Sequence, residues 1–288
     1  MKTRKKRLKR VMDIDNPALR VFSYALLVLI TIAVLVPLYI VVSLSFKTLA
    51  EANNSNVFAL PESFGYLDNY IFIWTRGKLL RGFKNTGILI ITSLIGSITM
   101  GTMVAYVLSR FEFKLKKAVY ILFMFPIVVP AVTTQVATFT IVRSLGLYNT
   151  IWAGIILYIS TDMLLIYIFL QHIEKIPVSL DESARTDGAS YWTIYRKIIL
   201  PQLRPAIVTG IIIKTLTIYN DLFTPYLYMP KSRLKTVTTS ILAFVADRTS
   251  DWGVVSAGIV SAIVPTVILY LLLQKYIISG VVDGAVKA

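Results

Sequence analysis

The sequence predicts an all-α, polytopic membrane protein that crosses the bilayer six times. Hydrophobic residues make up 56% of the 288 positions and the mean hydropathy is +0.70, well above the usage of soluble domains. The apolar residues also gather in six stretches of about 20 residues or more, the length that a helix needs to cross a bilayer. These stretches are 21–46, 86–108, 118–139, 151–170, 206–228 and 254–278. They are too long for β-barrel strands, whereas helices satisfy their own backbone hydrogen bonds in lipid.

The first element is a basic segment, residues 1–20, followed by the apolar stretch 21–46. A basic start before an apolar run is typical of a secretory signal peptide. Here, however, the run is longer than the apolar region of a signal peptide, and no small-residue cleavage site follows it. We therefore expect an uncleaved first span.

The basic residues predict the orientation of the later elements. A topology with the N-terminus inside places 19 Lys and Arg residues on the cytoplasmic side, counting Lys275 at the inner end of the last span, and 10 outside, with Lys214 inside a span. This asymmetry obeys the positive-inside rule and predicts that both termini are cytoplasmic. The loops then alternate, with 109–117 and 171–205 inside and 47–85, 140–150 and 229–253 outside. Within the first external loop, residues 67–75 are expected to form an interfacial helix.

Charge and cysteine content exclude several function classes. The net charge of +15 is not read as a nucleic-acid footprint, because the basic residues flank the spans, where they meet anionic lipid headgroups. The absence of cysteine excludes a disulfide framework, thiol catalysis and cysteine metal sites. With no Gly/Ser-rich linker and no internal repeat, we expect one integral domain over 21–278, between a cytoplasmic segment at 1–20 and a tail at 279–288.

The second cytoplasmic loop carries a helix–turn–helix pattern over residues 177–205. Pro177 can open a short helix because its missing N–H is not needed in the first turn, and acidic residues follow where they favour a helix N-terminus. Gly188 can end this helix by adopting positive φ. A second helix, aromatic and basic, is expected from Tyr191 until Pro201. The loop is therefore predicted to form an elbow that projects from the membrane.

Four residues of this elbow have a sequence spacing that is typical of a known loop. Gly, Ile and Pro lie 6, 16 and 19 residues after a Glu; the four are Glu182, Gly188, Ile198 and Pro201. This spacing resembles the EAA loop by which bacterial ABC importer permeases contact their ATPase. Ser183 stands where that loop usually has Ala, and both are small. The alternative is an ordinary amphipathic loop lying on the membrane surface.

The resemblance extends over most of the chain, specifically to permeases of carbohydrate importers. The shared elements are Asn85-Thr86, Ala105-Tyr106, Arg110-Phe111, Leu147-Tyr148-Asn149-Thr150, Asn220-Asp221 and a tail with Gly280 and Gly284-Ala285-Val286-Lys287. One departure is Leu115, which stands where the family usually has Gly after its Arg-Phe-x-Phe element.

The resemblance implies a binding-protein-dependent importer. Its expected partners are a second, non-identical permease, two ATP-binding subunits, an extracellular solute-binding protein, a sugar and the lipid bilayer. Contact with the ATPase is carried over to Glu182, Ser183, Ala184, Asp187, Gly188, Ile198 and Pro201, and to Gly284 and Lys287 in the tail. The chain contains no Gly-x4-Gly-Lys-Ser/Thr run, the loop that cradles nucleotide phosphates. ATP and Mg are therefore expected on the separate ATPase, and no cofactor on this chain.

Polar residues inside the predicted spans are candidates for the translocation path, because ionisable groups at membrane depth are costly. The polar candidates are Gln135, Asp162, Lys214, Asn220 and Asp221, and Tyr219 and Phe223 are added because their rings are suited to stacking on sugar rings. They would bond solute or form a gate. The competing interpretation is structural, either a Lys214–Asp162 pair between helices or residues that face a wet vestibule.

Two other function classes fit the sequence less well. An ion-driven secondary transporter usually carries inverted repeats; none is visible, and the elbow would have no purpose. A membrane-embedded enzyme would need catalytic residues, but the chain has a single His and no HExxH or paired-carboxylate motif. The sequence thus predicts an importer permease in a bacterial inner membrane, not an enzyme. The sugar is left open, and a non-sugar or anionic sugar-related solute is the alternative.

Overall fold

The computed structural model describes residues 17–129, 131–160, 163–247 and 251–285, and over these residues it consists of helices and turns without a strand. Asp162 and Lys287, two of the predicted site residues, lie outside the described residues. The described residues form two compact units, residues 17–71 with 251–260 and residues 72–247 with 261–285. The predicted all-α class is confirmed for the described chain.

The first unit begins with α2 (Pro17–Ser45), 29 residues long. After it, Thr48 caps α3 (Leu49–Asn54), since its hydroxyl accepts from the Glu51 N–H at 3.1 Å. The fully buried Lys47 donates to Ser55 Oγ at 2.8 Å. Asn69 Nδ2 donates to the carbonyls of Ser45 and Lys47 at 3.0 and 2.8 Å. These bonds fix the chain where α2 ends.

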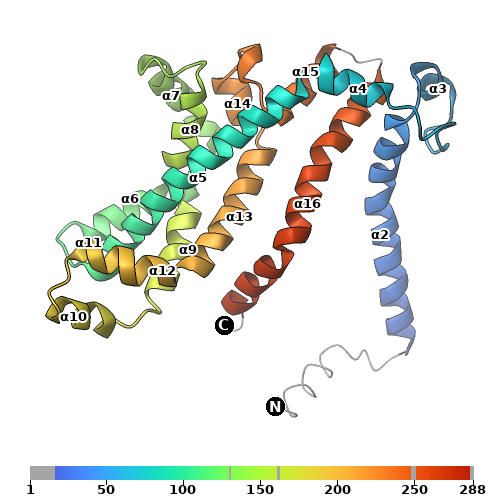
Figure 1. Cartoon of the computed structure of the whole chain (residues 1–288). Coiled ribbons are helices and arrows are strands. Elements are labelled where there is room, and N and C mark those ends of the chain that lie inside the picture. The colour runs from blue at the N-terminus through green and yellow to red at the C-terminus, as the bar shows by residue number, and fades with distance from the viewer. Residues whose placement is uncertain (1–16, 130, 161–162, 248–250, 286–288) are drawn as a thin grey trace. The chain divides into compact units, whose positions relative to one another are not determined.

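The second unit is built around α5 (Leu79–Arg110), a helix of 32 residues. It packs against α8 (Ile151–Ser160), α9 (Met163–Ile173), α13 (Arg204–Asn220) and α15 (Val237–Asp247), and Figure 1 shows these helices along its length. Small residues permit the close packing. A Cβ added at Gly96 would lie 2.3 Å from Ile159 Cδ1, so no larger residue fits there without a shift. Glycine at such contacts is typical of membrane helix pairs.

Shorter elements complete the chain. They are α4 (Asp68–Thr75), α6 (Lys116–Val128), α7 (Ala131–Ser144), α10 (Ser179–Thr186), α11 (Tyr191–Ile194), the π-helix η1 (Tyr195–Ile199), α12 (Leu200–Gln202), α14 (Phe223–Tyr228) and the 3₁₀ helix η2 (Ser232–Leu234). The last long helix is α16 (Trp252–Ala285). The helix expected over 67–75 is thus confirmed as α4.

Three helices are long and apolar enough to cross a membrane, namely α2, α5 and α16 between Trp252 and Leu272. Two bent pairs reach the same length together, α8 with α9 at 41° and α11–α12 with α13 at 71°. The described residues thus hold three to five candidate spans by length and composition.

Besides the stretch 118–139, which is divided between α6 and α7, two predicted stretches differ from the structure in detail. The stretch 206–228 is not one helix, because α13 ends at Asn220, Asp221 is extended and α14 starts at Phe223. The stretch 151–170 is divided between α8 and α9. Hydropathy alone does not reveal either break, since apolar residues continue on both sides of each.

Candidate functional site

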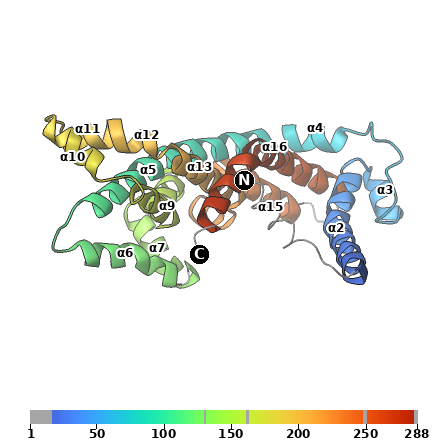
Figure 2. The same ribbon diagram turned by 90° about the horizontal axis from the view of Figure 1, so that it is seen from below.

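The loop predicted as an elbow does turn back on itself. In it, α10 is followed by Gly188 with φ of +82°, and Ser190 then caps α11 by accepting from the Thr193 N–H at 3.2 Å. The positive φ predicted for Gly188 is confirmed. Figure 2 shows α10, α11 and α12 gathered beside α9. The two ends differ from the prediction, since α10 starts at Ser179 rather than Pro177, and the second arm runs past Pro201 to Gln202.

The predicted contact residues divide between the two faces of the elbow. The exposed ones are Glu182, Ser183, Asp187, Gly188 and Pro201. Ala184 and Ile198 are half-buried and pack against the buried cluster beneath. The elbow therefore exposes most of its predicted contact residues, together with the apolar or aromatic side chains of Val178, Leu180, Tyr191 and Trp192, and rests on apolar contacts beneath.

An apolar cluster anchors the inner face of the elbow to the helices of the second unit. Ile194 and Ile199 are fully buried together with Phe169 of α9. Beside them, the hydroxyls of Thr102 on α5 and Tyr195 are 2.8 Å apart. Since densely packed interiors transmit displacement, the elbow and the ends of α5 and α9 are expected to move together.

A buried ion pair, missed in the sequence, joins α5 to the elbow. Arg110 Nε lies 2.8 Å from Asp181 Oδ2, and Arg110 Nη2 donates to the Ile176 carbonyl at 2.7 Å. The two side chains are 7% and 12% exposed. In the sequence, Asp181 is one of the acidic residues that follow Pro177, and Arg110 belongs to the family-like element Arg110-Phe111. Neither position indicates that the two side chains form a pair. They are 71 positions apart in the sequence, so no local signal reveals the pair.

Two of the predicted path residues meet at Tyr158, near the end of α8. The buried Lys214 donates its ammonium proton to the Tyr158 carbonyl, which also accepts from Ser97 Oγ at 3.3 Å. Carbonyls in the last turn of a helix lack intrahelical partners, and a cation there also complements the helix dipole. Lys214 thus satisfies a backbone carbonyl in the last turn of α8.

Asp221 meets the other end of the same tyrosine. Its Oδ2 accepts from the Tyr158 hydroxyl at 2.9 Å, while its Oδ1 accepts from the N–H groups of Phe223 and Thr224 at 2.8 and 3.3 Å. The carboxylate therefore caps α14 and ties it to α8. These bonds give Asp221 a structural role that the sequence did not show.

The other path candidates are spread over the second unit. Tyr219 donates to the Ala262 carbonyl at 2.8 Å, and Gln135 Oε1 accepts from the Tyr228 hydroxyl at 3.0 Å. Asn220 bonds within its own helix, and Phe223 is 64% exposed. The structure therefore does not gather all the candidates into one site. Gly284 lies near the end of α16.

Polar residues of the family-like elements hold the chain between α14 and α15 in place. Asn85 Nδ2 donates to the carbonyls of Arg233 and Lys235, each at 2.9 Å, and Thr86 Oγ1 accepts from the Val237 N–H at 3.1 Å. These bonds bind the segment to the start of α5, at the end of that helix opposite the elbow.

Comparison with known proteins identifies the family of this chain. Residues 97–282 match the family described as binding-protein-dependent transport system inner membrane component. The chain belongs to that family. Its members are transport permeases, so this chain is a multi-pass membrane component and not an enzyme.

Curated relatives cover nearly the whole length of the chain. It is 32% identical to the melibiose/raffinose/stachyose import permease protein MelC of Bacillus subtilis, over 88% of this chain and 91% of that one. It is 33% identical to the multiple sugar-binding transport system permease protein MsmG of Streptococcus mutans, over 92% and 96%.

A solved structure shares the fold. It is the crystal structure of a bacterial ABC transporter involved in the import of the acidic polysaccharide alginate. The match covers 92% of this chain and 98% of that one, with a TM-score of 0.79 and 22% sequence identity.

Proposed function

We propose that this chain is a permease subunit of a bacterial ABC importer that carries a sugar or an oligosaccharide across the inner membrane. The observation that carries the proposal is the near full-length similarity to MelC, a permease named for three oligosaccharides. The elbow supports it, since a membrane-embedded chain without a nucleotide-binding loop needs a surface on which a separate ATPase can act.

The proposed assembly has this chain and a second, non-identical permease around the path, with two ATPase subunits below and a solute-binding protein outside. The chain would cross the bilayer six times, with the third span made by α6 and α7, and with both termini cytoplasmic. Residues 21–278 would form the transmembrane domain. Glu182, Asp187 and their exposed neighbours on the elbow would meet the ATPase, and the tail with Gly284 and Lys287 would reach between the two ATPase subunits.

In the proposed mechanism, closure of the ATPase subunits on ATP and Mg pushes the exposed face of the elbow. The push would reach α5 through the Arg110–Asp181 pair and α9 through the apolar cluster. Such a push shifts the permeases between inward-open and outward-open states only if the ATPase binds one of the two states more tightly.

Uptake by intact cells tests the proposal. Deleting the gene should abolish energy-dependent uptake of at least one labelled sugar from a panel of neutral oligosaccharides and uronate-bearing ones, and the wild-type gene should restore it. A strain that loses only uronate uptake would change the substrate to an anionic sugar. Uptake that survives ATP depletion and follows an ion gradient would contradict the proposal.

A further inference from the structure

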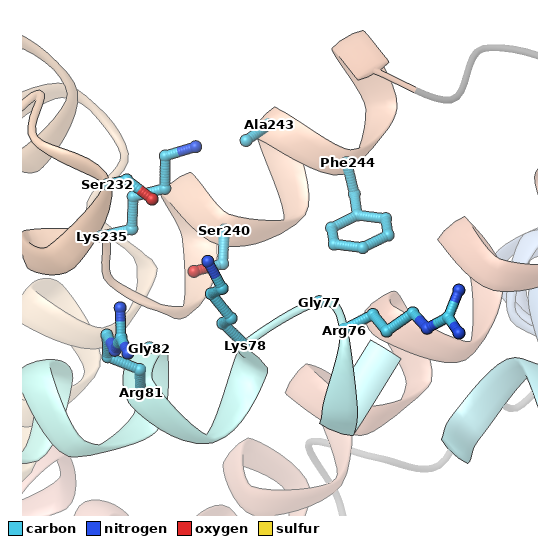
Figure 3. A pocket seen from close by; sticks show the side chains of 10 residues that line it. All are labelled: Arg76, Gly77, Lys78, Arg81, Gly82, Ser232, Lys235, Ser240, Ala243 and Phe244. Carbon is cyan, nitrogen blue, oxygen red and sulfur yellow. The ribbon is translucent and has the colours of Figure 1, made fainter. Parts of the chain in front are cut away.

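A basic pocket lies at the N-terminal end of α5, the end opposite the elbow. It is a cavity of about 160 Å³ between the α4–α5 turn, η2 and α15. Figure 3 shows Lys78, Arg81 and Lys235 on the same side of the pocket as Ser240, and Arg76 and Phe244 on the other side. The pocket is therefore lined by four cations and by serine hydroxyls.

No carboxylate balances this charge inside the pocket. Asp and Glu are absent from its lining, and in the described part of the chain none of the four cations forms an ion pair. Three of the four are exposed and Lys235 is half-buried. Cations that face a shared cavity repel one another, and a bound anion relieves that repulsion.

The walls of the pocket are held by contacts from distant parts of the chain. A Cβ added at Gly82 would lie 3.0 Å from Ser240 Oγ and 3.1 Å from the Thr236 carbonyl, so α5 and α15 approach closely there. The Asn85 bonds to the Arg233 and Lys235 carbonyls fix the facing wall. The site is thus formed before any ligand arrives, which lowers the entropy cost of binding.

Neighbouring aromatic residues indicate the depth of the pocket in the membrane. Trp74 stacks on Phe83 with ring centroids 5.3 Å apart and an interplanar angle of 7°, and these residues flank Arg76 and Arg81 in the sequence. Trp is enriched where a membrane meets water, and Lys and Arg extend their charged ends to the same level. With the proposed membrane placement, the cations are therefore expected at the level of the lipid headgroups, since they come just before the apolar stretch 86–108.

We propose that this pocket binds the phosphate group of an anionic phospholipid in the leaflet opposite the elbow. Arg, Lys and hydroxyl donors match the oxygens of a phosphate. The same donors form the basic pockets that bind anionic headgroups on the cytoplasmic side of membrane proteins. The proposal depends on the proposed membrane placement and is independent of the transported solute. It adds a lipid site to the permease.

Native mass spectrometry of the full chain, purified in detergent with the subunits that accompany it, tests the site. The probes are phosphatidylglycerol, phosphatidylcholine and inorganic phosphate, each added at the same concentrations. The site variant is Arg81→Gln with Lys235→Gln. The matched control is Arg143→Gln with Lys231→Gln, which removes the same charge from exposed residues outside the pocket. Lys78→Asn is a second site variant, since Asn tolerates the left-handed backbone of Lys78, with φ of 55°.

We expect wild type and control to retain phosphatidylglycerol over phosphatidylcholine, and the double site variant to bind phosphatidylglycerol roughly tenfold more weakly or worse. If that variant does not fold, weaker phosphatidylglycerol binding by Lys78→Asn supports the site in its place. Equal retention of the two lipids, or an equal loss in the control, would overturn the proposal. Tight binding of inorganic phosphate alone would replace the lipid with a free anion. If the double site variant binds phosphatidylglycerol as wild type does but no longer binds the solute-binding protein, the lipid proposal is overturned. The pocket would then be a docking site for a carboxylate of that protein.

Discussion

Arg110 and Asp181 form a buried ion pair between α5 and the elbow. Arg110→Gln would leave the buried Asp181 carboxylate without its cation, and such a loss costs about 3–5 kcal/mol. We expect a clear fall in the unfolding temperature of the purified protein and loss of ATPase co-purification. Replacing both residues, as Arg110→Met with Asp181→Leu, should recover part of the stability, because no buried charge remains.

The pair Lys116–Glu112 is a matched control. Lys116 Nζ lies 2.6 Å from Glu112 Oε1, about as close as the atoms of the buried pair, but the Glu112 side chain is 87% exposed. Exposed ion pairs contribute about 0–1 kcal/mol to stability. Lys116→Gln should leave the unfolding temperature nearly unchanged. An equal effect of Arg110→Gln and Lys116→Gln would show that the buried pair does not hold the elbow.

Gly188 allows the backbone of the turn to be tested apart from packing. A Cβ there would meet no atom within 4 Å, so any cost of Gly188→Val comes from the φ of +82°, on the order of 1–2 kcal/mol. We expect uptake to fall while the unfolding temperature of the membrane helices changes little. Gly188→Asn should be milder, since Asn tolerates this region. Normal uptake by Gly188→Val would contradict a need for this turn.

The two residue-scale features differ in how far the sequence revealed them. Gly188 was predictable because helix termination by a left-handed glycine is a local rule. The Arg110–Asp181 pair was not, because it joins residues 71 positions apart, and only the packing of α5 against the elbow brings them together.

At the scale of elements, Lys214 joins α13 to the end of α8 by its hydrogen bond to the Tyr158 carbonyl. Lys214→Met keeps much of the side chain but removes the ammonium donor from the Tyr158 carbonyl, which then accepts only from Ser97 Oγ. The loss of a hydrogen bond from a charged group costs about 1.5–3 kcal/mol. If Lys214 is structural, the yield of assembled transporter should fall. If it also pairs with Asp162, as the sequence allows, adding Asp162→Asn should restore part of that yield. If Lys214 meets solute, uptake should fall at normal yield. Wild-type yield and uptake would contradict both roles.

Hydropathy predicted the long elements well and the broken ones less well. The stretches 21–46 and 86–108 fall on α2 and α5, because a long apolar run leaves a helix as the only way to satisfy its backbone in lipid. The break after Asn220 was missed. It depends on hydrogen bonds from Asp221 to Tyr158, Phe223 and Thr224, which no apolar pattern records.

At the scale of the whole molecule, the absence of a nucleotide-binding loop from the sequence makes transport a property of the assembly. We expect the purified chain, reconstituted alone into liposomes, to leave imposed sugar and ion gradients intact. Adding the second permease, the ATPase and the binding protein should give sugar uptake that requires ATP. Robust ion-driven uptake by this chain alone would establish a secondary transporter instead.

Site-specific cross-linking tests the central claim, that the elbow is the surface on which the ATPase acts. The chain contains no cysteine, so Glu182→Cys introduces a single thiol on the exposed face of the elbow, and Lys231→Cys places one at the opposite end of α5. With a thiol-to-amine cross-linker of short reach, the account predicts that Glu182→Cys captures the ATPase subunit in membranes and that Lys231→Cys does not. No capture from Glu182→Cys, or equal capture from both positions, would contradict it.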